Sequence, residues 1–459
     1  MNIVEKVGLE KSVIFIAALV SFITAFLSNC ISVAVPVIAR DLLMSNIVQN
    51  WISTIFLLVI AMLSIPFGKV CGKYGFRKSL LISLIVVMIG VIGSSLAYSS
   101  EMLLFFRAFQ GIGDALLCVA SMALIVSAVP PQNRGRALGL NIAGVYIGLS
   151  LAPVISGFLT FNFGWRSIFY IVIPLLIIAF WFVYSLNGEW TTYKDEPIDK
   201  IGSIVYILGI MLFIYGFTII NTLTGVISFV VGLILLAIFG FIELRVEYPL
   251  FNVRLFKNIR FTSSTFASLI GYFATFVITY VLNYHFQYIM GLNSQSAGLI
   301  LIITPIMMAI LAPISGKLSD SINPQKIAAI GMACVAIAIL ILSFLNESTP
   351  LYIIAFAMFL QGIGYGLFSS PNTNAIMSSV PKKETPAASA SVASVRVIGQ
   401  TLSLGMLTVI FAIIMGNVTI IPQNYPLLIQ SSQYACIISV ILCIIAMISS
   451  LLGMKSSKY

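Results

Sequence analysis

Long apolar segments dominate this sequence and constrain its fold more than any other feature. Crossing the hydrocarbon core of a bilayer takes about 20 predominantly apolar residues. The chain is 60% hydrophobic and only 8% charged, whereas soluble domains carry roughly 25% charged residues. We therefore predict an all-α, polytopic membrane protein with fourteen transmembrane helices. The predicted spans are 12–36, 48–67, 79–98, 102–128, 137–161, 167–186, 201–221, 226–244, 261–286, 297–315, 327–345, 351–377, 387–415 and 431–453.

The basic residues predict the orientation of these helices. One side of the predicted membrane collects 20 of the 24 Lys and Arg residues, the other side has Arg40 and Arg166, and Arg107 and Arg396 fall inside spans. Cytoplasmic loops of membrane proteins are enriched in Lys and Arg. We therefore expect a multi-pass protein of the cell membrane with both termini in the cytoplasm. The net charge of +10 then reflects topology, and we expect no nucleic-acid partner.

Residues for several other kinds of chemistry are missing. The six cysteines show no CxxC or zinc-ligand spacing, which argues against a metal site or a disulfide framework. A single histidine and few acids leave no evident nucleophile or metal cluster, so a membrane-embedded enzyme is the weakest alternative. No Gly-x-x-x-x-Gly-Lys-Ser/Thr loop is present to bind ATP. We predict no cofactor and an ion gradient as the energy source.

An internal repeat divides the chain. The sequence Gln-Gly-Ile-Gly at 110–113 recurs at 361–364, an offset of 251, and Gly-Lys at 68–69 recurs at 316–317, an offset of 248. The repeat predicts a six-helix bundle in residues 1–189 and another in 258–459, with a cytoplasmic linker and an inserted helix pair in 190–257. Two parallel repeats of this kind leave a cavity between them near the membrane midplane, which is the architecture of alternating access.

Several motifs resemble the major facilitator superfamily, and the extra helix pair resembles its fourteen-helix drug:proton antiporter branch. Residues 107–113 are similar to the helix-4 motif whose Arg, here Arg107, is tied to proton coupling. Residues 139–157 follow the spacing of the helix-5 antiporter motif, through Gly139, Gly148, Pro153 and Gly157. We expect Gly148 and Gly157 to pack against the opposing bundle, although small residues permit close packing in any membrane protein. The helix-1 acid common in this branch aligns with Leu27.

Residues 68–78 resemble the loop between helices 2 and 3 of that family, with Gly72 in place of the usual acid. The resemblance implies that such loops brace the cytoplasmic start of a helix in the opposite half. In the second loop the acid is Asp320, which we expect to face Arg134 and Arg136, unless it is a solvated loop acid. The predicted gating residues are Gly68, Lys73, Gly75, Arg77, Lys78, Gly316, Asp320, Arg134 and Arg136.

Three charged residues lie well inside predicted spans: Arg107, Asp114 and Arg396. Ionisable groups near the bilayer centre cost at least roughly 2.5–3.5 kcal/mol, so they are functional candidates. Arg107 and Asp114 are seven residues apart, which places them on one helix face. A carboxyl group that releases its proton when a cation arrives is the minimal chemistry of antiport, so we assign proton coupling to Asp114 and Arg107. The alternative is a static pair of Asp114 with an Arg or a hydroxyl group.

The family resemblance implies a proton-coupled secondary transporter that exports amphipathic toxic compounds or drugs by alternating access, and we expect it to be monomeric. Its partners would be a small-molecule substrate, protons and the lipid bilayer. Export or exchange of an organic anion or metabolite is the alternative, favoured if Arg107 and Arg396 both point into the cavity. By family analogy the cavity would be lined by Asn29, Tyr365, Asn283, Asn372 and Arg396. A structural role at the domain interface is the other interpretation of Arg396.

Overall fold

The computed structural model describes residues 8–130, 134–191, 196–319, 321–381, 385–416 and 418–455. Within these residues, fourteen helices are long and apolar enough to cross a membrane, and no strand is found. This confirms the predicted all-α, polytopic fold. The first half contains α2 (Leu9–Asp41), α3 (Asn46–Tyr74), α4 (Phe76–Ser95), α5 (Ser100–Ala128), α6 (Arg134–Phe163), and α7 (Ser167–Tyr170) continued by α8 (Val172–Tyr184).

The remaining helices follow in the same order as predicted. They are α9 (Lys200–Thr218), α10 (Leu223–Glu243), α11 (Ile259–Tyr284), α12 (Ser294–Leu301) continued by α13 (Ile303–Leu318), α14 (Pro324–Leu342), α15 (Leu351–Ser378), α16 (Thr385–Ile414) and α17 (Tyr425–Lys455). Short 3-10 turns cover Val253–Lys257 and Pro422–Asn424, and a π-helical turn at His285–Ile289 extends α11.

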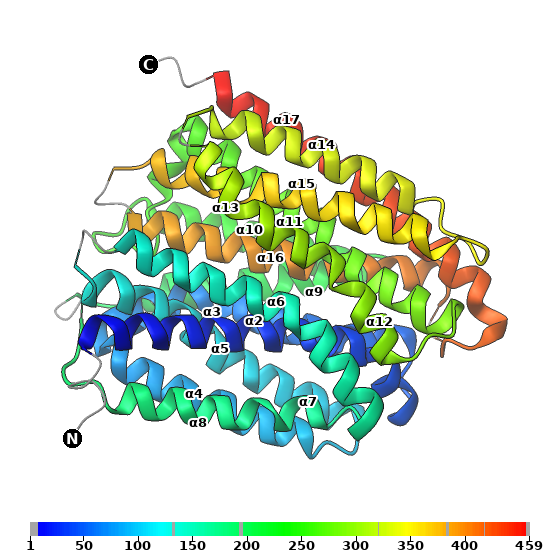
Figure 1. The fold of residues 1–459 in the computed structure, drawn as a ribbon. Helices are drawn as coiled ribbons and strands as arrows, with labels where there is room; N and C mark the ends of the chain where they lie inside the picture. The colour runs from blue at the N-terminus through cyan, green and yellow to red at the C-terminus, as the bar shows by residue number, and fades with distance from the viewer. Residues whose placement is uncertain are drawn as a thin grey trace.

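The helices lie side by side, and the largest contacts between the two halves involve α3 and α6 of the first half. Figure 1 shows the early helices at the bottom of the molecule and the late ones at the top. α3 packs against α16, and α6 packs against α12 and α13. The described chain starts at the first residues of α2 and ends at the last residues of α17, and both lie at the left of Figure 1. We call this end of the bundle the terminal face and the opposite end the distal face.

The repeat seen in the sequence recurs as a repeated contact. A Cβ atom added to Gly111 of α5 would lie 2.8 Å from the Phe56 carbonyl oxygen of α3. A Cβ atom added to Gly362 of α15 would lie 2.6 Å from the Thr304 carbonyl oxygen of α13. The glycines are 251 residues apart and their partners 248 apart, the two offsets found in the sequence. Both halves therefore use a glycine, which lacks a Cβ, to bring two helix backbones together.

The inserted helices α9 and α10 pack against each other, and α9 contacts both halves. The Tyr206 hydroxyl of α9 donates a hydrogen bond to the Ala61 carbonyl of α3 at 3.1 Å. On the other half, a Cβ atom added to Gly405 of α16 would lie 3.0 Å from the Thr218 methyl carbon. Only 17% of the α10 span is buried, so α10 is a peripheral helix. The boundaries drawn at 189 and 257 stay predictions.

Candidate functional site

Arg107 is enclosed between α5 and α3. Its side chain is fully buried, Nε donates to the Ile52 carbonyl at 3.2 Å and Nη1 donates to Gln110 Oε1 at 2.5 Å. The guanidinium lies over the Phe56 ring, 4.2 Å from its centroid, a favourable cation–π geometry. Nη2 has no hydrogen-bond partner. Arg107 thus joins two helices of the first half.

Asp114 lies two turns further along α5, a helix whose start is capped by Ser99 accepting from the Met102 amide. Its side chain is 1% exposed, and Oδ1 has no hydrogen-bond partner. The two ion pairs found within the described residues involve neither Asp114 nor Arg107. The static Asp114–Arg107 pair, one of the alternatives, is therefore not formed in this structure. A buried carboxyl group that no partner holds is able to bind a proton or a cation.

Arg396 brings a positive charge from the second half to the same region. Its side chain is half-buried, and no hydrogen bond or ion pair joins its guanidinium to another described residue. The charge of Arg396 acts on the Asp114 carboxyl group and on Tyr146 of α6. The Tyr146 hydroxyl is 3.0 Å from the Ser369 hydroxyl of α15. We call Asp114, Tyr146, Ser369 and Arg396 the central polar site, because it combines residues of both halves.

The sequence did not single out Tyr146 or Ser369. Hydroxyl residues are common in membrane helices, and neither residue carries a charge that would mark it. The one signal available was the repeat itself, in which Gly148 of α6 corresponds to Gly399 of α16. Tyr146 lies two residues before Gly148, and Arg396 lies three residues before Gly399. These two side chains therefore come from nearly equivalent places in the repeat.

Two of the predicted cavity residues are used for packing within one half. Asn29 Nδ2 donates to the Leu149 carbonyl at 3.5 Å, and Asn372 Nδ2 donates to the Ser264 carbonyl at 2.9 Å. Both asparagines are buried, so they tie neighbouring helices together. Tyr365 is 5% exposed and its hydroxyl has no hydrogen-bond partner. Its ring packs among aromatic rings of α11 and α15. The contact of Tyr365 with substrate therefore stays a prediction.

Hydrogen bonds between α11 and the first two helices join the halves at the distal face. The Tyr280 hydroxyl donates to Ser53 Oγ at 2.7 Å, and the Tyr284 hydroxyl donates to Asn50 Oδ1 at 2.6 Å. Asn283, predicted to line the cavity, donates instead to the α2 backbone at 2.6 Å. We call Asn50, Ser53, Tyr280, Asn283 and Tyr284 the polar seal. All five side chains are buried, so the halves are closed against each other at this face.

A spacing pattern in α3 could have pointed to the polar seal. Asn46, Asn50 and Ser53 occur at i, i+4 and i+7, which places them on one helix face. Asn46 also contacts the second half, through its side chain and the Gly416 carbonyl at 2.8 Å. Apart from the Tyr146–Ser369 contact, the inter-half hydrogen bonds found among the described residues lie at this face.

The glycines of the helix-5 motif make two different kinds of contact. A Cβ atom added to Gly148 would lie 2.7 Å from the Phe22 carbonyl oxygen of α2, in the same half. The expectation that Gly148 packs on the opposing bundle is therefore wrong. A Cβ atom added to Gly157 would instead overlap the Ser294 carbonyl oxygen of α12, in the opposing half. In the same α6–α12 contact, the Pro153 carbonyl lies against Gly298 of α12. Gly139 is further from this contact, near the start of α6.

The loop between α3 and α4 is fixed to its own half. Gly75 ends α3 with a positive φ of 107°, and a Cβ atom there would overlap the Glu189 side chain. Glu189 accepts from the backbone amides of Arg77 at 2.8 Å and Lys78 at 3.2 Å. The Arg77 guanidinium in turn donates to the Tyr184 carbonyl at 2.7 Å. These contacts hold the loop to residues of its own half, whereas the expectation was a contact with a helix of the opposite half.

A second acid reaches the end of α3 from the linker before α9. Lys69 forms an ion pair with Glu196, and Lys73 Nζ donates to the Glu196 carbonyl at 3.0 Å. Lys69 is only 5% exposed and Glu196 is 32% exposed, so only the lysine end of this pair is shielded from water. Gly72 supplies no acid, and the carboxylates beside this loop come from Glu189 and Glu196. No motif in the sequence pointed to either acid, although both lie in the longest polar stretch of the chain.

The second gating loop is only partly described. Gly316 lies in α13, where an added Cβ atom would be 2.7 Å from Ser370 Oγ of α15. Asp320 and the side chains of Arg134 and Arg136 lie outside the described residues. Gly68 lies within α3, about two turns before Gly75. The expected approach of Asp320 to the start of α6 therefore stays a prediction.

The whole arrangement is the fold of a membrane transporter. It is similar to the crystal structure of a bacterial homolog of the human lysosomal transporter Spinster, with a TM-score of 0.67 and 17% identity over 98% of this chain and 98% of that chain. The family model of the Major Facilitator Superfamily matches residues 17–404 and 264–458. The chain belongs to this superfamily, and it is a multi-pass membrane protein whose described residues contain fourteen helices able to span a membrane.

Two named relatives are similar to most of the chain. The riboflavin transporter RibZ of Clostridioides difficile (strain 630) is 26% identical, over 87% of this chain and 88% of the relative. The multidrug resistance protein Stp of Mycobacterium tuberculosis (strain CDC 1551 / Oshkosh) is 25% identical, over 88% of this chain and 74% of the relative. Their different names mean that family membership defines transport but not the substrate.

Proposed function

We propose that this transporter exports amphipathic, cationic or neutral toxic compounds from the cell in exchange for protons. The observation that supports this most strongly is the Asp114 carboxyl group, which is buried in a membrane span and has an Oδ1 atom without a hydrogen-bond partner. Burial favours the neutral form of such a group, and a cation beside it favours the charged form. Binding of a cation would therefore release the proton, and reprotonation would release the cation.

Alternating access would connect this exchange to the two sides of the membrane. With both termini in the cytoplasm, the polar seal closes the outer side, and it must open before a substrate can leave. Protons that move inwards release roughly 2.3 kcal/mol per 100 mV of membrane potential, which is enough to drive export. The multidrug resistance protein Stp, similar over 88% of this chain, is consistent with a toxic substrate.

The test replaces Asp114 in purified protein reconstituted into liposomes that contain a pH-sensitive dye. Adding ethidium should drive proton movement in the unmodified protein. Asp114→Asn should abolish that movement, because an amide of similar shape cannot titrate, while the protein still folds. Glu347→Gln is the matched control, since Glu347 is an exposed acid in the loop after α14. Ethidium-driven proton movement of normal size in Asp114→Asn would contradict the proposal.

Export or exchange of an organic anion is the second candidate, and Arg396 is the observation that favours it. Arg396 is half-buried near Asp114 and has no hydrogen bond to a described residue, so it could bind an anionic group. Arg107 gives this candidate no support, because its guanidinium is fully buried and already donates to the Ile52 carbonyl and to Gln110. The relative named as a riboflavin transporter suggests riboflavin as the second probe in the same liposomes. Riboflavin transport that survives Asp114→Asn and is lost in Arg396→Gln would favour this candidate.

A further inference from the structure

A pocket with a volume of ≈ 450 Å³ lies among α3, α4 and α5, away from the central polar site. It opens on the outside of the first half, because Tyr74 and Ile82 on its walls are 60% and 57% exposed. In a membrane protein, an outer surface of this kind is in contact with lipid. The lining residues are Phe67, Val70, Tyr74, Lys78, Ser79, Ile82, Ser83, Val86, Ile112, Gly113 and Leu116.

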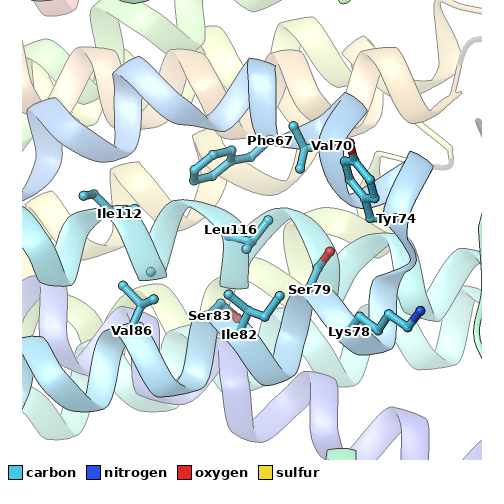
Figure 2. Close-up of a pocket in the computed structure, with 11 residues that line it drawn as sticks. Phe67, Val70, Tyr74, Lys78, Ser79, Ile82, Ser83, Val86, Ile112 and Leu116 are labelled. Atoms are coloured by element: carbon cyan, nitrogen blue, oxygen red, sulfur yellow. The ribbon is translucent and has the colours of Figure 1, made fainter. Parts of the chain in front are cut away.

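The pocket has a polar end and an apolar end. Figure 2 shows Lys78 and Tyr74 at one end, and Val86 and Ile112 at the other. Lys78 is near the first residue of α4, at the terminal face, whereas Val86 is eight residues further on. At a rise of 1.5 Å per residue, the pocket therefore runs roughly 12 Å into the membrane from its boundary. Such a groove matches the direction of a lipid acyl chain.

The only charged group that lines the pocket is the Lys78 ammonium. The hydroxyls of Ser79 and Ser83 are used within α4, donating to the carbonyls of Gly75 at 2.7 Å and Leu80 at 2.9 Å. Lys78 is exposed, and no hydrogen bond or ion pair joins its ammonium to another described residue. The Glu189 carboxylate nearby accepts the backbone amide of Lys78 instead. A free positive charge thus stands at the mouth of an apolar groove.

We propose that this groove binds one anionic phospholipid from the leaflet at the terminal face. The phosphate would lie at Lys78, and an acyl chain would lie along Ile82, Val86 and Ile112. The terminal face is strongly basic, and basic groups at a membrane surface attract anionic lipids. An anionic lipid satisfies both ends of the groove, whereas a free phosphate would leave its apolar end empty. Gly113, which lines the groove, is adjacent in sequence to Asp114. A bound lipid would therefore contact α5 beside the residue that belongs to the central polar site.

The experiment measures lipid binding to the purified, detergent-solubilised full chain by native mass spectrometry. The probes are phosphatidylglycerol and phosphatidylcholine with identical acyl chains. Lys78→Gln should weaken phosphatidylglycerol binding about fivefold, the effect of roughly one surface lysine on an anionic membrane, and leave phosphatidylcholine binding unchanged. Ile82→Trp should weaken the binding of both lipids, because the larger ring fills the groove. Thermal unfolding verifies that both variants fold, which their exposed positions favour.

Lys326→Gln is the matched control. Lys326 follows Lys78 by the repeat offset of 248 and is exposed near the start of α14, so its replacement removes the same charge from the same face. Phosphatidylglycerol binding that is equally weak in Lys326→Gln would indicate a general surface charge and overturn the proposal. Unchanged binding in Lys78→Gln, equal binding of the two lipids to the unmodified protein, or full displacement by inorganic phosphate would overturn it as well.

Discussion

At the scale of single residues, the three charges inside spans have different surroundings. The Arg107 guanidinium is held by the α3 backbone, by Gln110 and by an aromatic ring. Asp114 and Arg396 lack such partners among the described residues. The sequence identified all three, because a charge in an apolar run is conspicuous. The sequence could not distinguish a charged group that is bound by its neighbours from one that is free to bind a ligand. This difference depends on residues of other helices.

This difference predicts that Arg107 is more important for stability than Asp114. Lysine keeps the positive charge of Arg107 but cannot lie flat over Phe56 while donating to both of its acceptors. Arg107→Lys should therefore lower the free energy of unfolding by about 2 kcal/mol, the combined effect of a buried cation–π contact and a hydrogen bond. Asp114→Asn should leave it nearly unchanged, because Oδ1 makes no hydrogen bond. Reversible denaturation in micelles measures both, and equal losses would contradict the distinction.

At the scale of helices, hydropathy predicted the spans better than their ends. The span predicted at 48–67 continues in α3 to Tyr74, because a helix keeps its backbone hydrogen bonds beyond the apolar core. It stops where Gly75 takes a positive φ of 107°. The breaks between α7 and α8 and between α12 and α13 were missed, since apolar residues run through both. The polar seal was missed too, because Asn50 and Tyr284 are 234 residues apart and no local pattern pairs them.

The two glycine contacts of α6 predict two different defects. Gly148→Ala should destabilise the first half by about 1–3 kcal/mol, because the added methyl group overpacks α6 against α2. Gly157→Ala should instead separate α6 from α12 and favour opening of the distal face. Spin labels at positions 98 and 352, where Tyr98 and Tyr352 are 81% and 73% exposed, would report the distance between the halves there. A distance distribution that is unchanged in Gly157→Ala would contradict the assignment of this contact to the closed face.

At the scale of the whole molecule, the inserted helix pair is attached unequally to the two halves. Tyr206 of α9 donates a hydrogen bond to α3, and the preceding linker provides the Glu196 carboxylate to buried Lys69. Toward α16, α9 presents the Thr218 methyl group and the Phe217 ring around Gly405. The repeat predicted the insertion but not its position in the fold, because α9 and α10 have no copy in the repeat. Apolar surfaces slide more readily than hydrogen-bonded ones, so we expect the pair to move with the first half.

This attachment predicts opposite effects of two cross-links on the same helix. Trp51 of α3 and Tyr215 of α9 have ring centroids 6.2 Å apart, and Thr218 contacts Gly405 of α16 one turn further on. In a background without native cysteines, Trp51→Cys with Tyr215→Cys and Thr218→Cys with Gly405→Cys can each be joined by a short, reducible bis-thiol linker. The link between α9 and α3 should leave transport at the level of the unlinked pair, because these helices move together. The link between α9 and α16 should stop transport until it is reduced, because the halves could no longer rock past each other. Transport blocked only by the α9–α3 link would assign the inserted helices to the second half instead.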